Sequence, residues 1–239
     1  MYNKILFISI LVVSFSTNAM TIDTMLKISD DNGTGVFSIT NDLKDPSFIK
    51  IKPSKITINN DGELVKNEYT KDNLNEWEIA ITQNKVIVEP NRVKNIGVRS
   101  LCVDGCDRSQ DTVFAIKFLP SPYIKDGRKK ASVTINYGYE ALFVIPALEP
   151  SYKYKISRDD DNILLENKGN SLLRVFVNQC RNEIKSSCSR SAVVLAGRKK
   201  TLKLPVNARQ KVLNLDIMGY NNSFYKKATL SRSNPIIRS

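Results

Sequence analysis

Short apolar segments separated by turn-forming residues recur along the chain, and they constrain its fold more than any other feature. Asn, Asp, Gly or Pro lies between the segments, and no stretch combines helical periodicity with capping residues. The segments are residues 35–39, 48–51, 77–81, 85–88, 113–118, 163–165, 172–177, 193–195 and 212–217. This pattern predicts an all-β sandwich fold.

The first nineteen residues have the composition of a secretory signal peptide. Lys4 precedes an apolar core at residues 5–15, and the small residues Thr17 and Ala19 suit a cleavage site. The apolar core is shorter than the roughly 18 residues that a transmembrane helix needs. We therefore expect residues 1–19 to be removed, and an exported chain without stable membrane insertion to begin near Met20.

The length of the mature chain suits two domains. About 220 residues remain, which is enough for two immunoglobulin-like sandwiches of about 100 residues each. Prolines bracket residues 146–150, where they would stop strand pairing on both sides. We predict an N-terminal domain at residues 20–146 and a C-terminal domain at residues 147–239, joined by a short hinge in an L-shaped or boomerang-shaped arrangement.

The four cysteines form two close pairs, one in each predicted domain. Cys102 lies near Cys106, and Cys180 lies near Cys188. In an exported protein these pairs predict local disulfides, although four cysteines allow three pairings. Zinc is disfavoured because the chain has no histidine and the usual two-residue spacing between cysteines is absent.

The composition argues against an enzyme. Without histidine, imidazole-based triads and histidine acid–base chemistry are excluded, and glycine-rich phosphate-binding signatures are also missing. We expect no catalytic residues, no cofactor and no metal. The formal net charge is +12, with basic clusters at residues 128–130 and 198–200. In an exported protein these clusters indicate solvated loops rather than a nucleic-acid site.

One stretch before the predicted hinge alternates strictly between large and small side chains. Its large residues are Val133, Ile135, Tyr137 and Tyr139. A period of two places all four on one face of a strand. A half-buried strand facing its own core would show the same pattern. As the last strand of the first domain, however, it could lend this row to another protein, or pair with itself when free.

The order of these features resembles the two-domain periplasmic chaperones of the bacterial chaperone/usher pathway, in the branch that serves alpha-type fimbriae such as colonization factors. The resemblance rests on the order and spacing of several segments and covers nearly the whole mature chain. The segments are residues 48–56, 84–100, 113–122, 132–146 and 163–180.

The resemblance implies a function in donor-strand complementation. A fimbrial subunit of this pathway is a sandwich that lacks its final strand, and the chaperone supplies a strand until an outer-membrane usher accepts the subunit. Val133, Ile135 and Tyr137 would be the donors, with Tyr139 as a further candidate. The implied partners are fimbrial subunits, either a major pilin or a tip adhesin, and the usher, and the implied location is the periplasm.

The sequence departs from the wider family at the expected anchor for the subunit's terminal carboxylate. The family's arginine on the first strand falls near Met25 here, and its lysine late in the donor strand falls near Ala141. Lys27 is the nearest basic residue that could replace the arginine, and a solvated lysine is the alternative.

Two other classes of protein stay open. A fimbrial subunit or adhesin would share the sandwich fold, but only a few residues separate Ala19 from the first predicted strand, which leaves little room for a donor extension. A two-domain carbohydrate-binding module would need exposed aromatic side chains. The sole tryptophan, Trp77, lies in an alternating run that predicts partial burial.

Overall fold

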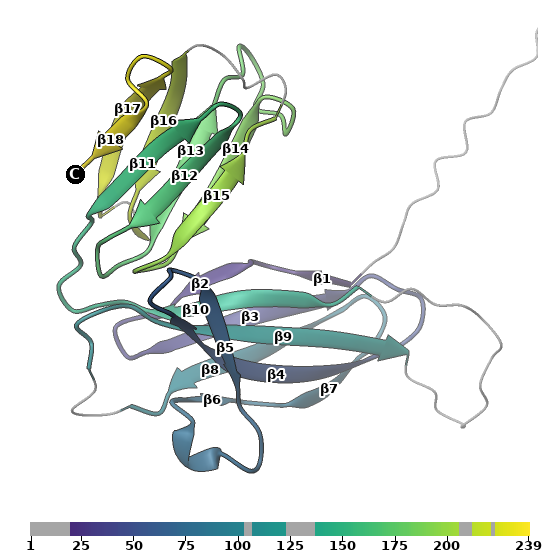
Figure 1. Ribbon diagram of the computed structural model, residues 1–239. Coiled ribbons are helices and arrows are strands. Elements are labelled where there is room, and N and C mark those ends of the chain that lie inside the picture. The colour runs from purple at the N-terminus through teal and green to yellow at the C-terminus, as the bar shows by residue number, and fades with distance from the viewer. Residues whose placement is uncertain (1–19, 103–106, 123–136, 206–211, 221–222) are drawn as a thin grey trace, which may run out of the picture.

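The computed structural model describes residues 20–102, 107–122, 137–205, 212–220 and 223–239, which form two β-sandwiches (Figure 1). The N-terminal sandwich contains β1 (Met20–Ile22), β2 (Leu26–Ile28), β3 (Thr34–Asn41), β4 (Ser47–Ile58), β5 (Leu64–Glu68), β6 (Ile79–Ile81), β7 (Lys85–Val88), β8 (Arg92–Ser100), β9 (Thr112–Pro122) and β10 (Tyr139–Ile145). The C-terminal sandwich contains β11 (Tyr154–Asp159), β12 (Asn162–Asn167), β13 (Leu173–Asn178), β14 (Ser189–Val194), β15 (Lys199–Lys203), β16 (Val212–Met218), β17 (Tyr225–Ser231) and β18 (Ile236–Arg238). The expectation of an all-β fold with two sandwiches is confirmed.

Each sandwich consists of two facing sheets. In the N-terminal sandwich, sheet A has the strand order β1-β3-β8-β6, and sheet B has the order β2-β10-β9-β4-β5, with β7 also paired to β4. In the C-terminal sandwich, sheet C has the order β15-β12-β11-β18, and sheet D has the order β14-β13-β16-β17. Among the described residues the only helix is the short 3-10 helix η1 (Leu74–Glu76), and no helix there is long and apolar enough to cross a membrane.

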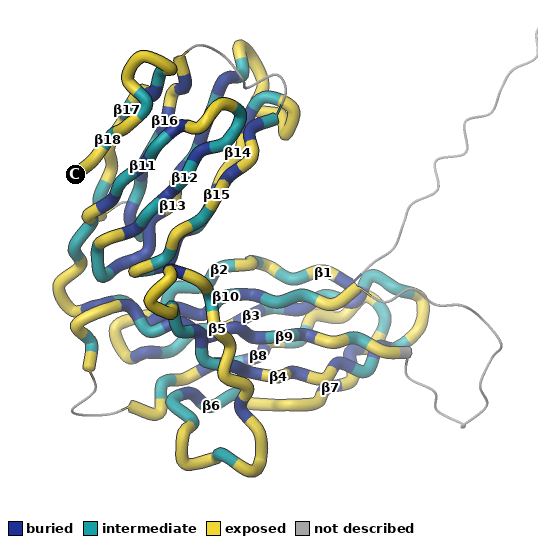
Figure 2. Tube along the Cα trace, viewed as in Figure 1, coloured by how far each residue is buried: buried dark blue, intermediate teal, exposed yellow. Residues whose placement is uncertain are grey.

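Alternating side chains fill the two cores, as the changing burial along the strands shows (Figure 2). In β9, Phe114, Ile116 and Phe118 are fully buried against the side chains of the facing sheet, such as Phe37. The rings of Phe37 and Phe118 meet edge to face with centroids 5.7 Å apart. This packing fixes which face of β9, and of its neighbour β10, points into the core.

The N-terminal segment passes from one sheet to the other. β1 pairs antiparallel with β3 in sheet A, whereas β2 pairs parallel with β10 in sheet B. Between these strands, the Thr24 hydroxyl donates a hydrogen bond to the Leu26 carbonyl and accepts one from the Leu26 N–H. This local turn lets two short strands complete the edges of two different sheets.

An apolar cluster joins the two sandwiches. Ile56, Val113 and Val144, on the outer face of sheet B, pack in one cluster with Leu172 and Leu195 of the C-terminal sandwich. At a second contact, the N–H of Lys199 donates a hydrogen bond to the carbonyl of Gly62, which has a φ of +80° in the β4–β5 turn. Both contacts lie at the end of the second sandwich that faces the first one in Figure 1.

Candidate functional site

The strand β10 has a partly open edge. It pairs with β9 along its full length, from Tyr139 to Ile145, but with β2 only over Leu142–Val144. Within the described residues, Tyr139–Ala141 therefore pair on one side only. Unpaired strand edges are templates for another strand, because their N–H and C=O groups lack ladder partners.

The side chains of β10 alternate between two environments. Ala141 and Phe143 are fully buried in the N-terminal core. Leu142 and Val144 point to the opposite face, where they belong to the cluster that joins the sandwiches. Odd-numbered positions of this strand thus face the sandwich core, which sets the face that an extended N-terminal continuation of β10 would use.

The predicted donor residues are placed only in part. Val133 and Ile135 lie outside the described residues. Tyr137 is described and is 72% exposed. Tyr139 is half-buried, packs against the N-terminal core and donates a hydrogen bond from its hydroxyl to the Met20 carbonyl at 2.5 Å. The two tyrosines therefore differ: Tyr137 is turned to solvent, whereas Tyr139 is engaged within its own sandwich.

Lys27, the candidate carboxylate anchor, lies on β2 and has a partner in the same segment. Its Nζ is 3.1 Å from Oδ2 of Asp23 and 5.9 Å from the centre of the Phe37 ring. Burial would raise the pKa of Asp23, but the hydrogen bond from the Ser38 N–H and the ammonium of Lys27 together hold that pKa below its usual value. To bind another carboxylate, Lys27 would have to share its charge with Asp23.

A charged network covers part of the outer face of sheet B. Glu140 on β10 bonds to Lys66 and lies 3.7 Å from the Nζ of Lys117, which in turn lies 3.4 Å from Glu68. These side chains are partly exposed, so each pair contributes at most about 1 kcal/mol. The network adjoins the open edge of β10, and it places both signs of charge beside that edge.

The predicted disulfides have separate outcomes. Cys180 and Cys188 form a disulfide with their Cα atoms 5.1 Å apart. Cys102 is also disulfide-bonded, but its predicted partner, Cys106, lies outside the described residues. The bond between Cys180 and Cys188 closes the β13–β14 connection.

A buried carboxylate links the two sandwiches, and sequence reasoning did not single it out. Asp111, directly before β9, is 7% exposed. Its Oδ2 accepts a hydrogen bond from the Leu172 N–H at 2.7 Å, and its Oδ1 accepts bonds from the Ala147 N–H at 2.9 Å and the Ser171 hydroxyl at 3.0 Å. Burial raises the pKa of Asp111, and these hydrogen bonds oppose that rise.

Further hydrogen bonds surround this carboxylate. The Arg108 guanidinium donates to the carbonyl of Pro146 at 2.9 Å from Nη2. The Asn170 side chain donates to the carbonyls of Ser109 and Glu149, at 2.7 and 2.9 Å. Three segments, the approach to β9, the linker and the β12–β13 turn, are therefore held together by short polar contacts.

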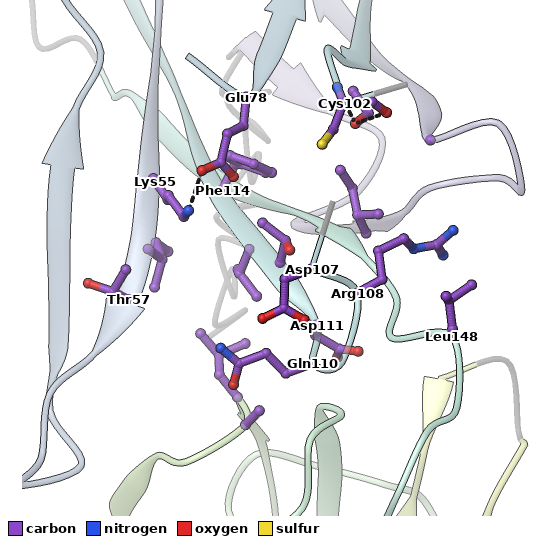
Figure 3. A pocket seen from close by; sticks show the side chains of 18 of the residues that line it. Lys55, Thr57, Glu78, Cys102, Asp107, Arg108, Gln110, Asp111, Phe114 and Leu148 are labelled. Carbon is purple, nitrogen blue, oxygen red and sulfur yellow. Dashed lines mark hydrogen bonds and ion pairs between the residues drawn. The ribbon is translucent and has the colours of Figure 1, made fainter. Parts of the chain in front are cut away.

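This joint borders a cavity of about 1120 Å³ (Figure 3). In the view of Figure 3, the ion pair of Lys55 and Glu78 lies to one side of the cavity, Asp111 and Gln110 lie near its centre, and Leu148 lies to the other side. The charges of Lys55, Glu78 and Asp111 are already engaged by protein groups. We therefore interpret this cavity as part of the joint.

Trp77 is half-buried, as the sequence predicts. Its ring stacks on Tyr69 with centroids 5.3 Å apart and planes 14° apart, and its Nε1–H donates to the Thr70 carbonyl at 3.1 Å. The described residues contain no group of three or more His, Cys, Asp or Glu side chains that could hold a metal ion.

Comparison with known proteins decides the family. Residues 22–146, more than half of the chain, match the family model described as the CS5 fimbrial protein N-terminal domain. The chain belongs to this CS5 fimbrial family. The matched region of this CS5-family chain ends where the linker begins. Among curated proteins, none matches the sequence.

Solved structures share the fold of this CS5-family chain. The class 5 fimbriae chaperone CfaA is 18% identical, with 88% of this chain and 98% of that chain covered and a TM-score of 0.52. The Escherichia coli chaperone DraB is 7% identical, with 90% and 96% covered and a TM-score of 0.55. A chain of the Salmonella enterica complex of SafA pilin with the SafB chaperone is 9% identical, with 91% and 98% covered and a TM-score of 0.53. The family model thus confirms a fimbrial family, and these structures confirm the fold that the resemblance implies.

Proposed function

We propose that this CS5-family chain is a periplasmic chaperone that binds fimbrial subunits by donor-strand complementation and delivers them to an outer-membrane usher. The observation that carries the proposal is the open edge of β10 at Tyr139–Ala141, directly after the exposed Tyr137. An edge of this kind can accept a strand of a second protein without unfolding the sandwich that bears it.

The alternation of β10 supports the choice of donor residues. Ala141 and Phe143 face the core. Val133, Ile135 and Tyr137 are also odd-numbered, so in a continuous strand they would lie on the same face as these two residues. When the run is extended alongside a subunit, these three side chains form one row that continues the core-facing row of β10. Each large apolar side chain buried in a groove contributes roughly 1.5–3 kcal/mol before ordering costs. No bound nucleotide and no catalytic step are needed.

The solved relatives also favour a chaperone over the alternative of a fimbrial subunit or adhesin. CfaA, DraB and SafB are named as chaperones, and SafB was solved with a pilin. A chain with two sandwiches and an open edge on the last strand of the first one suits the same task. Residues 1–19 would direct export to the periplasm as a cleaved signal peptide.

The direct test is recovery of a partner from the host. We expect an affinity-tagged chain, purified from the periplasm under native conditions, to bring with it a small β-rich protein in a one-to-one complex. Cytoplasmic expression without residues 1–19 is the matched control and should yield the chain alone. Recovery of a bare monomer from fimbriated cells, or polymerisation of the chain itself into fibres, would contradict the chaperone function.

A further inference from the structure

A second groove lies on the N-terminal sandwich, between β5 and β7. Both strands pair with β4, β7 along Ser47–Lys50 and β5 along Ser54–Ile58. In the gap between them, two backbone hydrogen bonds close the edge of β4, from Ile51 to Asn84 and from Tyr69 to Pro53. The diverging strands leave a cavity of about 690 Å³, a size typical of ligand sites.

The groove has an apolar wall and a strongly basic rim. Tyr69 and Trp77 form the stacked wall, and Leu74 of η1, which is 61% exposed, extends it. In Figure 1 the loop that carries η1 projects from the N-terminal sandwich on the side away from the C-terminal one. The basic residues of the lining are Lys50, Lys52, Lys71, Lys85 and Lys117.

The charges of this rim are poorly balanced. The lining contains five lysines and one acidic residue, Glu68, which lies 3.4 Å from Lys117. Among the described residues, the other four lysines form no ion pair. Four like charges around one groove attract an anionic ligand, and their field is strengthened by the low-dielectric wall beside them.

The spacing of the lysines indicates the shape of that ligand. Lys50 and Lys52 are both exposed and stand two residues apart on the same face of β4. Side chains at such positions repeat at about 6.6 Å along a strand. Carboxylates at alternate positions of an extended peptide repeat at the same distance, so one peptide can pair with both ammonium groups at once.

We propose that this groove binds an acidic polypeptide segment in extended conformation, with carboxylates at alternate positions facing the lysines and the remaining side chains against Trp77 and Leu74. Lys117 of the groove also lies 3.7 Å from Glu140 on β10, but the inference does not depend on strand donation. A partner of this chemistry would be held by charge and by the stacked aromatic wall together.

Trp77 provides a direct reporter, because it is the only tryptophan of the chain. We would titrate the whole protein with a ten-residue peptide of alternating Glu and Val and follow the Trp77 emission. We expect a saturable change that weakens as salt is added, since exposed charges are screened. The same peptide with Lys in place of Glu should produce no change.

Paired variants locate the binding. In Lys50→Gln/Lys52→Gln the dissociation constant should rise by roughly three- to tenfold, the loss expected for two exposed charge pairs. Lys203→Gln/Lys226→Gln removes two exposed lysines of the C-terminal sandwich and should leave binding unchanged. An unchanged emission with the acidic peptide, or equal weakening in both variants, would overturn the proposal. A sulfated hexasaccharide or inorganic phosphate that bound as tightly as the peptide would also overturn it, because the groove would then be a general anion site.

Discussion

Oδ2 of Asp111 lies 2.7 Å from the backbone nitrogen of Leu172, so one carboxylate of the first sandwich holds the chain at the start of the second. The same carboxylate accepts a hydrogen bond from the N–H of Ala147 in the linker. Beside the apolar cluster, a polar contact that a single substitution can remove therefore bridges the two sandwiches.

Asp111→Asn should loosen this joint. Asparagine has an NH2 group in place of one carboxylate oxygen, and this group cannot accept a hydrogen bond from the backbone N–H that it would face. A buried N–H left without an acceptor costs about 1–3 kcal/mol. We expect this loss in the free energy of unfolding, and a broader distance distribution between spin labels at Val93 and Tyr225, which are both exposed. Asp107→Asn, at a carboxylate that accepts the Ser109 N–H, is the control. Identical distance distributions in both variants and the wild type would show that the cluster alone fixes the angle.

The raised pKa of Asp111 predicts a pH dependence. Because burial raises this pKa above its value in the unfolded chain, the folded state binds the proton more tightly, and stability falls as pH rises through that window. The free energy of unfolding of the wild type, minus that of Asp111→Asn, should therefore increase as pH is lowered from 7 toward 3.8, the ordinary pKa of aspartate. Urea unfolding of both proteins at several pH values measures this difference. A decrease on acidification would mean that the hydrogen bonds outweigh burial.

Ile135→Asp should abolish recovery of a subunit and leave the melting temperature nearly unchanged. A charge at this position would enter the apolar groove of the partner, where an unpaired carboxylate is strongly unfavourable. Tyr137→Asp should behave in the same way, because Tyr137 is 72% exposed in the free protein.

Thr134→Ala is the matched control for these donor variants, since it changes the opposite face of the same run. It should retain the subunit. If Ile135→Asp unfolds the chain by itself, Ile135 belongs to the protein's own core and the run is an ordinary strand.

Removal of the disulfide between Cys180 and Cys188 should have a modest effect. The two residues are 8 apart in sequence, and loop-closure entropy gives about 2.5 kcal/mol for a loop of this size. Cys180→Ala/Cys188→Ala should lower the melting temperature of the C-terminal sandwich and preserve its fold. Peptide mapping without reduction should show the two cysteines in one linked fragment. A linked fragment that joined Cys180 to Cys102 would contradict the pairing.

The sequence predicted the buried strands well, because alternation of apolar residues reports burial on one face. Residues 85–88 coincide with β7, and residues 113–118 form the centre of β9. The inner strand β11 was missed, and so were exposed edge strands. β5 is almost fully exposed, and β17 has a single buried residue, so neither shows the apolar alternation that marks a strand.

The site was predictable only where the pattern was local. The alternating row that ends at Tyr139 was visible in the sequence, but the different environments of Tyr137 and Tyr139 depend on contacts with Met20, at the other end of the domain. Asp111 was overlooked because one acidic residue before a strand is indistinguishable from a turn residue. Its three hydrogen-bond partners lie up to 61 residues away.

The parallel pairing of β2 with β10 has a consequence for the order of assembly. If the chain is exported as proposed, Leu26 would be among the first residues to cross the inner membrane, yet its ladder partner is Leu142. Sheet B cannot close until nearly the whole first sandwich has been translocated, and such distant pairings slow folding. During this interval β2 has no ladder partner from its own chain. A newly exported molecule would then itself be vulnerable to strand pairing with its neighbours.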